Sequence, residues 1–192
     1  MYTTLLTNLE NGIFTITINR PDKLNALNKD VFTDLDNVVN EISSNPEIKC
    51  AVITGAGPKA FVAGADITEF GGLNKDEAMA LAKRGQDVFF KIENCKKPIV
   101  AAVNGFALGG GLELALACRY RIALAGDRTS LGLPEVMLGI HPGFGGTVRA
   151  VRLLGVTAAM PLMLTGKPVR GDKALRLGLV DRLVASEQLE AT

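Results

Sequence analysis

The sequence predicts an α/β domain, a class in which strands and helices alternate along one chain. Three observations indicate it. Short apolar runs at 13–18, 50–54 and 98–103 are typical of strands, and stretches with helical spacing separate them. The run at 98–103 is uninterrupted, as expected of a strand covered on both faces. Glycine-rich segments follow the second and third runs, where loops are expected.

The chain begins with a predicted hairpin. Residues 2–9 and 13–18 flank Asn11-Gly12, a strong signal for a two-residue turn. Asn28 is a suitable N-cap for a helix. The apolar residues of that helix recur at helical spacing: Leu35, Val38, Val39 and Ile42. The strand at 50–54 follows, and Asn74 is expected to cap a helix that runs to about Glu93.

The second half continues the alternation. After the strand at 98–103 come a glycine tract, a helix from about Leu112, and strands near 120–123 and 130–131. From Gly146 onward the pattern is helical with glycine punctuation, and 180–184 is typical of a last short strand. The chain contains no repeat, low-complexity tract or convincing linker, so we expect a single domain over residues 1–192.

Composition narrows the class of protein. A length of 192 residues with 47% hydrophobic and 21% charged residues is ordinary for a soluble globular domain. The net charge of +1 argues against a nucleic-acid partner, because neutralising phosphates needs a clear basic excess. The three scattered cysteines lack metal or redox spacing, so we expect reduced, buried thiols. The N-terminus lacks a signal-peptide pattern, which favours a cytoplasmic location.

One segment, residues 98–118, raises the alternative of a membrane span. It is nearly uncharged and about as long as the ~20 residues that cross a bilayer. Its dense glycines, together with Asn104 and Glu113, suit a buried strand, loop and helix better than a lipid-facing helix. We therefore expect no membrane partner.

Two glycine-bearing loops are candidates for binding a ligand. They occupy 61–67 and 105–113, and each follows an apolar strand. Small residues let backbone N–H groups approach a ligand closely, and a helix start adds the positive end of a dipole. Neither loop matches a P-loop or a dinucleotide-binding fingerprint. A glycine triplet alone is more often explained by close packing than by catalysis.

Glu113 and Glu135 strengthen the catalytic interpretation, because both lie among apolar and glycine residues. A carboxylate that loses hydration has a raised pKa, which suits proton exchange near neutral pH. If the fold brings the two together, they form an acid/base site. The alternatives are a solvated helix residue for Glu113, and for Glu135 a loop carboxylate paired with an arginine such as Arg149.

Other polar residues indicate less. His141 is the only histidine and has no flanking nucleophile motif, so we interpret it as a loop residue. No cluster of His, Asp or Glu has ligand spacing, and we predict no metal site. Asp66 is either a residue of a ligand-binding loop or a helix N-cap, and we favour the cap.

Several motifs together resemble the crotonase (enoyl-CoA hydratase/isomerase) superfamily. They are Asn-Arg-Pro at 19–21 with Asn-Ala-Leu at 25–27, Phe-Val-Ala-Gly-Ala-Asp-Ile at 61–67, Lys-Pro-Ile-Val-Ala-Ala-Val-Asn-Gly at 97–105, Gly-Gly-Gly-Leu-Glu-Leu at 109–114, and Leu-Pro-Glu at 133–135 leading to Pro-Gly-Phe-Gly-Gly-Thr at 142–147. The resemblance implies a spiral of ββα units that binds acyl-CoA. It also implies a lyase of fatty-acid oxidation, which adds water reversibly across the 2,3 double bond of a 2-enoyl-CoA.

The same resemblance implies roles for particular residues. Glu113 and Glu135 match the two catalytic glutamates of hydratases, and Ala65 and Gly110 match the donors of the oxyanion hole. The remaining substrate-binding positions are Ala26, Ala63, Asp66, Ile67, Thr68 and Gly143. No cofactor is expected, since coenzyme A is part of the substrate. The partner is acyl-CoA, and we also expect a homo-oligomer or a covalent partner domain in a multifunctional parent.

The chain departs from the family pattern in two ways. It is expected to lack the further C-terminal helices with which stand-alone members continue. Its length instead resembles that of the hydratase domain of the large multifunctional fatty-oxidation enzymes. Residues to about Ala117 resemble a monofunctional short-chain hydratase, while 131–184 resemble the multifunctional type. We hypothesise a truncated or excised, engineered or chimeric domain. The alternative functions are enoyl-CoA isomerisation or another crotonase reaction, and an acyl-CoA-binding domain with little or no activity.

Overall fold

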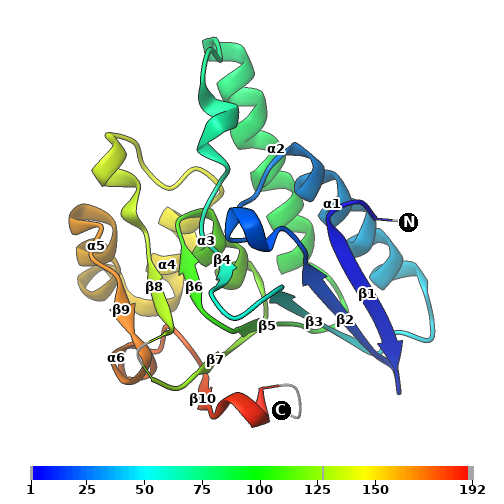
Figure 1. Cartoon of the computed structure of the whole chain (residues 1–192). Helices are drawn as coiled ribbons and strands as arrows, with labels where there is room; N and C mark the ends of the chain where they lie inside the picture. Colours follow the sequence, from blue (N-terminus) through cyan, green and yellow to red (C-terminus); the bar gives the residue numbers. More distant parts are fainter. Residues whose placement is uncertain (1, 127, 190–192) are drawn as a thin grey trace.

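The computed structural model describes residues 2–126 and 128–189, and these form two sheets covered by helices (Figure 1). The larger sheet has six strands, in the order β1-β2-β3-β5-β7-β10. Only the β1–β2 hairpin is antiparallel within it. Its strands are β1 (Leu5–Glu10), β2 (Ile13–Ile18), β3 (Cys50–Gly55), β5 (Ile99–Val103), β7 (Tyr120–Leu124) and β10 (Arg182–Val184).

The smaller sheet has four short strands, in the order β4-β6-β8-β9. The first three are parallel, and β9 pairs antiparallel to β8. These strands are β4 (Ala60–Val62), β6 (Phe106–Leu108), β8 (Ser130–Gly132) and β9 (Val169–Arg170).

Six α-helices and four 3-10 helices complete the described residues. The α-helices are α1 (Lys29–Ser44), α2 (Lys75–Glu93), α3 (Gly110–Ala117), α4 (Gly146–Leu154), α5 (Val156–Thr165) and α6 (Gly171–Leu177). The 3-10 helices are η1 (Pro21–Lys23), η2 (Ile67–Phe70), η3 (Pro134–Leu138) and η4 (Ser186–Gln188). Asn28 and Asn74 cap α1 and α2 through their side-chain oxygens, as predicted.

The chain repeats one pattern three times: β3-β4-α2, β5-β6-α3 and β7-β8-α4. Each repeat places its first strand in the larger sheet, its second strand in the smaller sheet, and then a helix. The segment η3 lies between β8 and α4 in the third repeat. This arrangement confirms the predicted α/β spiral of ββα units.

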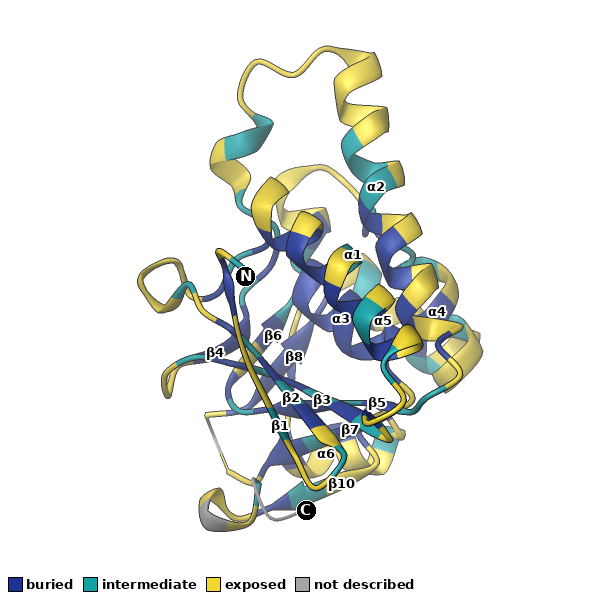
Figure 2. Cartoon of the chain, turned by 90° about the vertical axis from the view of Figure 1, so that its right-hand side faces the viewer, coloured by how far each residue is buried: buried dark blue, intermediate teal, exposed yellow. Residues whose placement is uncertain are grey.

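Helix α3 is the centre of the spiral. All eight of its residues are buried, and Figure 2 shows it enclosed by the other elements. The packing is close: a Cβ atom at Gly111 would lie 2.0 Å from the carbonyl oxygen of Val62 in β4. Glycine is therefore required there, and Glu113 is carried on the same helix into the interior.

The two halves of helix α2 differ in how they pack against the rest of the domain. Its C-terminal half packs on the body through Val88, Phe89 and Ile92, whereas its N-terminal half projects from the body (Figures 1 and 2). Phe89 meets Phe32 of α1 and Phe144, with ring centroids 5.1–5.8 Å apart in this group of three. The aromatic cluster thus joins α1 and α2 to the turn that precedes α4.

The structure corrects several sequence-based expectations. The segments interpreted as loops at 61–67 and 105–113 contain parts of β4 and β6, and α3 begins at Gly110 rather than near Leu112. The region expected to be helical after Gly146 contains β9. Strands of two or three residues are too short to show a period of two, which explains the misses. Cys50 is only half-buried, although all three cysteines are free as expected.

Candidate active site

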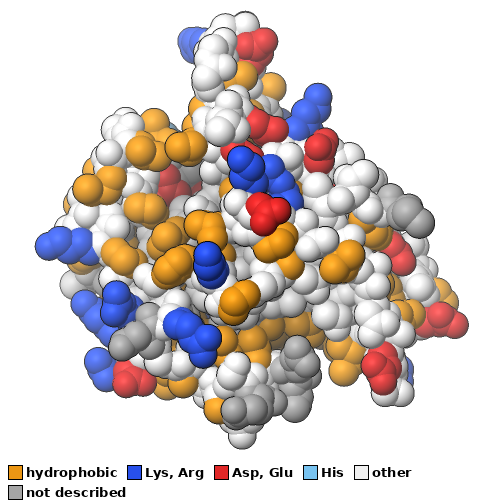
Figure 3. Space-filling model, in the orientation of Figure 1, with side chains coloured by type: hydrophobic (Ala, Val, Ile, Leu, Met, Phe, Trp, Pro, Cys, Tyr) orange, Lys and Arg blue, Asp and Glu red, His pale blue; other side chains and the backbone are white. Residues whose placement is uncertain are grey.

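A cavity of about 620 Å³ lies beside the projecting part of α2. One wall comes from η2 and the N-terminal half of α2, the opposite wall from η3 and the segment after it, and the floor from β6 and α3. In Figure 3 hydrophobic side chains surround the hollow on this face. The four residues predicted as catalytic or oxyanion-hole groups all line this one cavity: Ala65, Gly110, Glu113 and Glu135.

Glu113 is held in a fixed position. It is 1% exposed, and its Oε1 accepts hydrogen bonds from the backbone N–H groups of Phe144 at 2.8 Å and Gly146 at 2.7 Å. Burial raises its pKa to about 7, although the two N–H donors favour the charged form. Both N–H groups donate to Oε1, so neither of them binds Oε2. The alternative of a solvated helix residue is wrong.

Glu135 lies on η3 and has no comparable support. It is 9% exposed, and its buried Oε2 has no hydrogen-bond partner among the residues that the structure describes. Burial also raises the pKa of this carboxyl group. The alternative of an Arg149 partner is wrong, because Arg149 pairs with Glu93 at 2.8 Å. A buried carboxylate oxygen without a donor, beside a cavity, points to a ligand that supplies the contact.

Two residues that line the cavity, Ala65 and Gly110, have backbone N–H groups outside the regular hydrogen-bond pattern. Ala65 forms a parallel bridge with Leu27 whose hydrogen bonds use the Gly64 carbonyl and the Asp66 N–H, which leaves the Ala65 N–H outside the ladder. Gly110 is the first residue of α3, and the first N–H groups of a helix have no intrahelical acceptor. These two peptide groups are therefore candidates for binding an oxyanion, one of them at a helix N-terminus.

The other predicted substrate-binding residues fall into two groups. Ala63, Ile67 and Gly143 line the cavity, whereas Ala26, Asp66 and Thr68 are absent from its lining. Asp66 caps η2, as favoured from the sequence, by accepting from the Thr68 N–H and hydroxyl. The Thr68 hydrogen bond and Arg20, 2.9 Å away, lower the pKa of Asp66.

Residues that sequence reasoning did not assign form most of the apolar wall. They are Phe70, Leu73, Ala78, Leu81, Ala82, Leu108, Leu138, Ile140 and Phe144. His141, which was interpreted as a loop residue, does lie in a loop but also lines the cavity. Most of these apolar residues lie next to a glycine in the sequence, which was the available signal, whereas Ala78, Leu81 and Ala82 lie within α2 and gave none.

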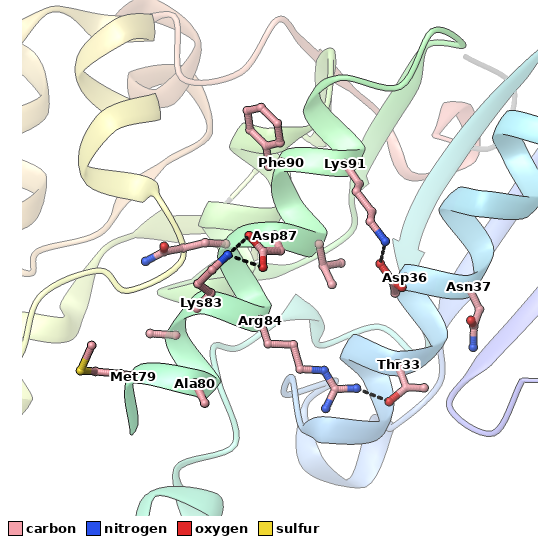
Figure 4. Close-up of a pocket in the computed structure, with 13 residues that line it drawn as sticks. Thr33, Asp36, Asn37, Met79, Ala80, Lys83, Arg84, Asp87, Phe90 and Lys91 are labelled. Carbon is pink, nitrogen blue, oxygen red and sulfur yellow. Dashed lines mark hydrogen bonds and ion pairs between the residues drawn. The ribbon is translucent and has the colours of Figure 1, made fainter. Parts of the chain in front are cut away.

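A second and larger hollow of about 1100 Å³ runs between α1 and α2, away from the two glutamates (Figure 4). Its charged groups pair with one another. Lys83 meets Asp87 at 2.7 Å, and Lys91 pairs with Asp36. These side chains are exposed, so water screens their charges. Unlike the first cavity, this groove is not lined by a buried pair of carboxyl groups.

The described residues contain neither a metal-binding cluster nor a membrane-spanning helix. No three His, Cys, Asp or Glu residues come together to hold a metal ion within 2–126 and 128–189. In the same described residues, no helix is long and apolar enough to cross a membrane.

Comparison with known proteins agrees with the fold. The sequence profile described as enoyl-CoA hydratase/isomerase matches residues 8–192. The chain belongs to this family. One relative within it, the short-chain-enoyl-CoA hydratase of Clostridium acetobutylicum, is 47% identical over 95% of this chain and 69% of its own length. The crotonyl-CoA hydratase of Syntrophomonas wolfei is 45% identical over 98% of this chain and 72% of its own length.

Solved structures of the family share the fold. The crystal structure of enoyl-CoA hydratase from Bacillus anthracis superimposes with a TM-score of 0.93 and 36% sequence identity. The match covers 98% of this chain and 73% of that one. The enoyl-CoA hydratase/isomerase fold is therefore present over nearly the whole described chain.

Proposed function

We propose that this member of the enoyl-CoA hydratase/isomerase family adds water reversibly to the 2,3 double bond of a 2-enoyl-CoA. One observation carries the proposal: two buried carboxyl groups, Glu113 and Glu135, line the same cavity as two peptide N–H donors, those of Ala65 and Gly110. The names of the relatives support the same reaction.

The thioester carbonyl oxygen is proposed to bind between the N–H groups of Ala65 and Gly110. Attack of water at C3 of the enoyl group moves electron density onto this oxygen and builds an enolate. Two fixed donors stabilise that charge more than they stabilise the neutral carbonyl, which is the condition for acceleration. Loss of one such donor typically costs about 3 kcal/mol of barrier.

The two glutamates are proposed to divide the proton transfers. Ionised Glu113 accepts a proton from water while the water oxygen bonds to C3. Protonated Glu135 donates its proton to C2 as the enolate collapses, so the product gains one water molecule and the enzyme keeps one proton overall. A pKa of about 7 lets Glu113 serve in either direction. The N–H of Gly143, a residue that lines the cavity, is proposed to help hold the water.

The cavity also fits the apolar part of such a substrate. A volume of about 620 Å³ is ordinary for a small-molecule site, and the wall is mostly apolar. The proposal places backbone contacts to CoA at Ala26, Ala63, Asp66, Ile67 and Thr68. It needs no cofactor beyond the CoA of the substrate, and it extends to a cytoplasmic role in fatty-acid oxidation.

The test is loss of the absorbance of crotonyl-CoA on addition of the purified chain, with CoA binding measured in parallel. Turnover that is abolished in both Glu113→Gln and Glu135→Gln supports hydration. Binding of CoA without turnover of crotonyl-CoA would favour an acyl-CoA-binding domain instead. Conversion of a 3-enoyl-CoA without hydration would favour isomerisation.

We also propose that the domain works in an assembly, either a homo-oligomer or a chain with a covalent partner domain. Large apolar side chains are exposed together on η3 and α5, including Met137 at 75% and Leu164 at 64%. Exposed apolar residues in such number are typical of surfaces that another chain or domain covers. Analytical ultracentrifugation of the chain tests the first form, and a monomer at all concentrations would exclude it.

A further inference from the structure

Arg149 on α4 is a buried cation that the proposed reaction does not yet use. It is 9% exposed and makes contacts in two directions. Its Nε donates to Glu93 Oε2 at 3.0 Å, and its Nη2 lies 2.8 Å from the same oxygen. Its Nη1 donates to the carbonyl oxygen of Phe144 at 2.8 Å. The guanidinium therefore joins the C-terminal end of α2 to the turn before α4.

That turn also holds the Glu113 carboxylate. Phe144 and Gly146 donate their N–H groups to Glu113 Oε1, so Phe144 bonds Arg149 through its carbonyl oxygen and Glu113 through its N–H. The turn is tightly fitted on both sides. A Cβ atom at Gly145, where φ is +102°, would lie 2.4 Å from Arg149 Nη1, and one at Gly146 would lie 2.7 Å from Glu113 Cγ. A shift of the turn would move the carboxylate with it.

The ring of Phe144 is a second anchor of the same turn. It packs 5.1 Å from the ring of Phe32 and 5.8 Å from that of Phe89. Gly85 of α2 provides the space, because a Cβ atom there would lie 2.3 Å from Phe144 Cδ1. A ring alone still allows the peptide plane to tilt about it. The Arg149 contact fixes the carbonyl oxygen of Phe144, which lies along the chain between the two donor N–H groups of Phe144 and Gly146.

We propose that Arg149, itself fixed by Glu93, is a positioning residue that holds the 144–146 turn so that its two N–H groups place the Glu113 carboxylate for catalysis. Arg149 acts through the peptide groups of the turn, without touching substrate. Its fork of donors suits this role, since one planar group satisfies a carboxylate and a carbonyl at fixed angles. The inference rests on the proposed hydration reaction.

The positive charge of Arg149 acts on a measurable quantity, the pKa of Glu113. A role for Arg149 in packing alone would not change that pKa. Its positive charge favours ionised Glu113, whereas burial and the charge of Glu135 favour the protonated form. Removing Arg149 loosens two donors and deletes this charge. Both effects raise the pKa of the Glu113 carboxyl group.

The experiment compares Arg149→Met, Arg149→Lys and Glu93→Gln with the control Arg152→Met. Arg152 lies on the same helix but is exposed, so its replacement should leave activity within about twofold. We expect Arg149→Met to lower kcat for crotonyl-CoA hydration by about 10²-fold with KM changed less than about threefold, because the reacting group is misplaced while binding is kept. Arg149→Lys and Glu93→Gln should lie between this variant and wild type.

A double-variant cycle separates positioning from general stability. If Arg149 acts through Glu113, then adding Arg149→Met to Glu113→Gln should lower the residual rate by less than about threefold. A full further loss of about 10²-fold would overturn the proposal. Urea unfolding of each variant identifies any that fail to fold, and Arg149→Lys then serves in place of Arg149→Met.

A measurement without substrate keeps the inference distinct from the proposed function. Carbon-13 NMR titration of the Glu113 carboxyl group should show a higher pKa in Arg149→Met than in wild type or Arg152→Met. Unchanged titration and unchanged protection of the Phe144 and Gly146 amides from hydrogen exchange would overturn the proposal, whether or not the chain hydrates crotonyl-CoA. Absence of hydration with the shifted titration would count against the function alone.

Discussion

The two glutamates of the cavity have similar burial but different support. Glu113 lies on a helix with no exposed residue, and two backbone N–H groups hold one of its oxygens. Glu135 lies on a 3-10 helix at the cavity wall, and its buried Oε2 has no donor among the described residues. Both pKa values are raised by burial, yet only Glu113 is fixed in place by the fold.

This difference separates two ways of building an acid/base pair. The position of Glu113 is determined before substrate binds, and Arg149 and the 144–146 turn supply that order. The buried Oε2 of Glu135 has no hydrogen-bond donor among the described residues, and a bound ligand would supply one. A fixed group suits orientation of a small, mobile water molecule, and a free carboxyl oxygen suits transfer of a proton to a carbon atom of the substrate.

The largest expected effect is the loss of either acid. Glu113→Gln should lower kcat for crotonyl-CoA hydration by about 10³-fold, because the amide cannot accept the proton of water. Its Oε1 can still accept from Phe144 and Gly146, so folding should persist. Glu135→Gln should have an effect of similar size, since its amide cannot protonate C2. A loss below about tenfold in either variant would break the assignment.

Stability should depend on pH through Glu113. Its pKa in the folded protein is about 7 against an ordinary value of 4.5, so the folded state binds its proton more tightly than the unfolded state does. The resulting stabilisation is present below pH 4.5 and is lost as the pH rises through about 7. It amounts to roughly 3 kcal/mol.

Urea unfolding of wild type and Glu113→Gln at acidic and alkaline pH measures this contribution. The difference in unfolding free energy between the two proteins should shift in favour of the variant as the pH rises. Glu47→Gln, which changes an exposed residue, is the matched control and should follow wild type. Parallel curves for all three proteins would contradict a raised Glu113 pKa.

Two glycines allow each acid to be displaced separately. A Cβ atom at Gly146 would lie 2.7 Å from Glu113 Cγ, and one at Gly109 would lie 2.9 Å from Glu135 Oε1. We expect Gly146→Ala to lower kcat by about 10²-fold, because the fixed carboxylate has no room to move. Gly109→Ala adds backbone strain at φ +52° and should also lower kcat.

Gly171→Ala is the control for these glycine variants, since its added Cβ would meet only ordinary contacts of 3.5 Å or more. Its kcat should match wild type. If Gly146→Ala were as active as Gly171→Ala, the position of Glu113 would not matter to the reaction.

The pH dependence of the reaction should reflect one proton shared by the pair. Initial rates at low crotonyl-CoA concentration should pass through a maximum and fall by about tenfold per pH unit on either side. The acid limb is expected near pH 7, where Glu113 becomes protonated and can no longer accept a proton from water. The alkaline limb follows the loss of the Glu135 proton. The reverse dehydration should show the same limbs, because the overall reaction releases no proton. A rate that stays flat from about pH 6 to about pH 9 would contradict the shared proton.

The sequence predicted most of the strands and helices that display a long periodic pattern. The hairpin around Asn11-Gly12 and the caps at Asn28 and Asn74 follow from local chemistry, and the structure has them. The short strands β4 and β6 were missed, because three residues carry no readable period and their pairing is with strands far along the chain.

The site was predicted only in part, because local signals could be read from the sequence and long-range contacts could not. Apolar neighbours of Glu113 and Glu135 indicated burial, and the structure places both in one cavity. The sequence did not reveal that Arg149 pairs with Glu93, or that Phe144 and Gly146 hold Glu113, since these contacts join residues 31 to 56 positions apart. Such contacts depend on the spiral rather than on any local pattern.

The most direct test of the account is a crystal structure of the Glu113→Gln variant with 3-hydroxybutyryl-CoA, the hydration product of crotonyl-CoA. The proposed hydration mechanism requires the thioester oxygen to lie about 2.7–3.1 Å from the N–H groups of both Ala65 and Gly110. It also predicts the 3-hydroxyl group beside residue 113 and C2 facing Glu135. A thioester oxygen that contacts neither N–H group, or an acyl chain outside the cavity between the two acids, would contradict it.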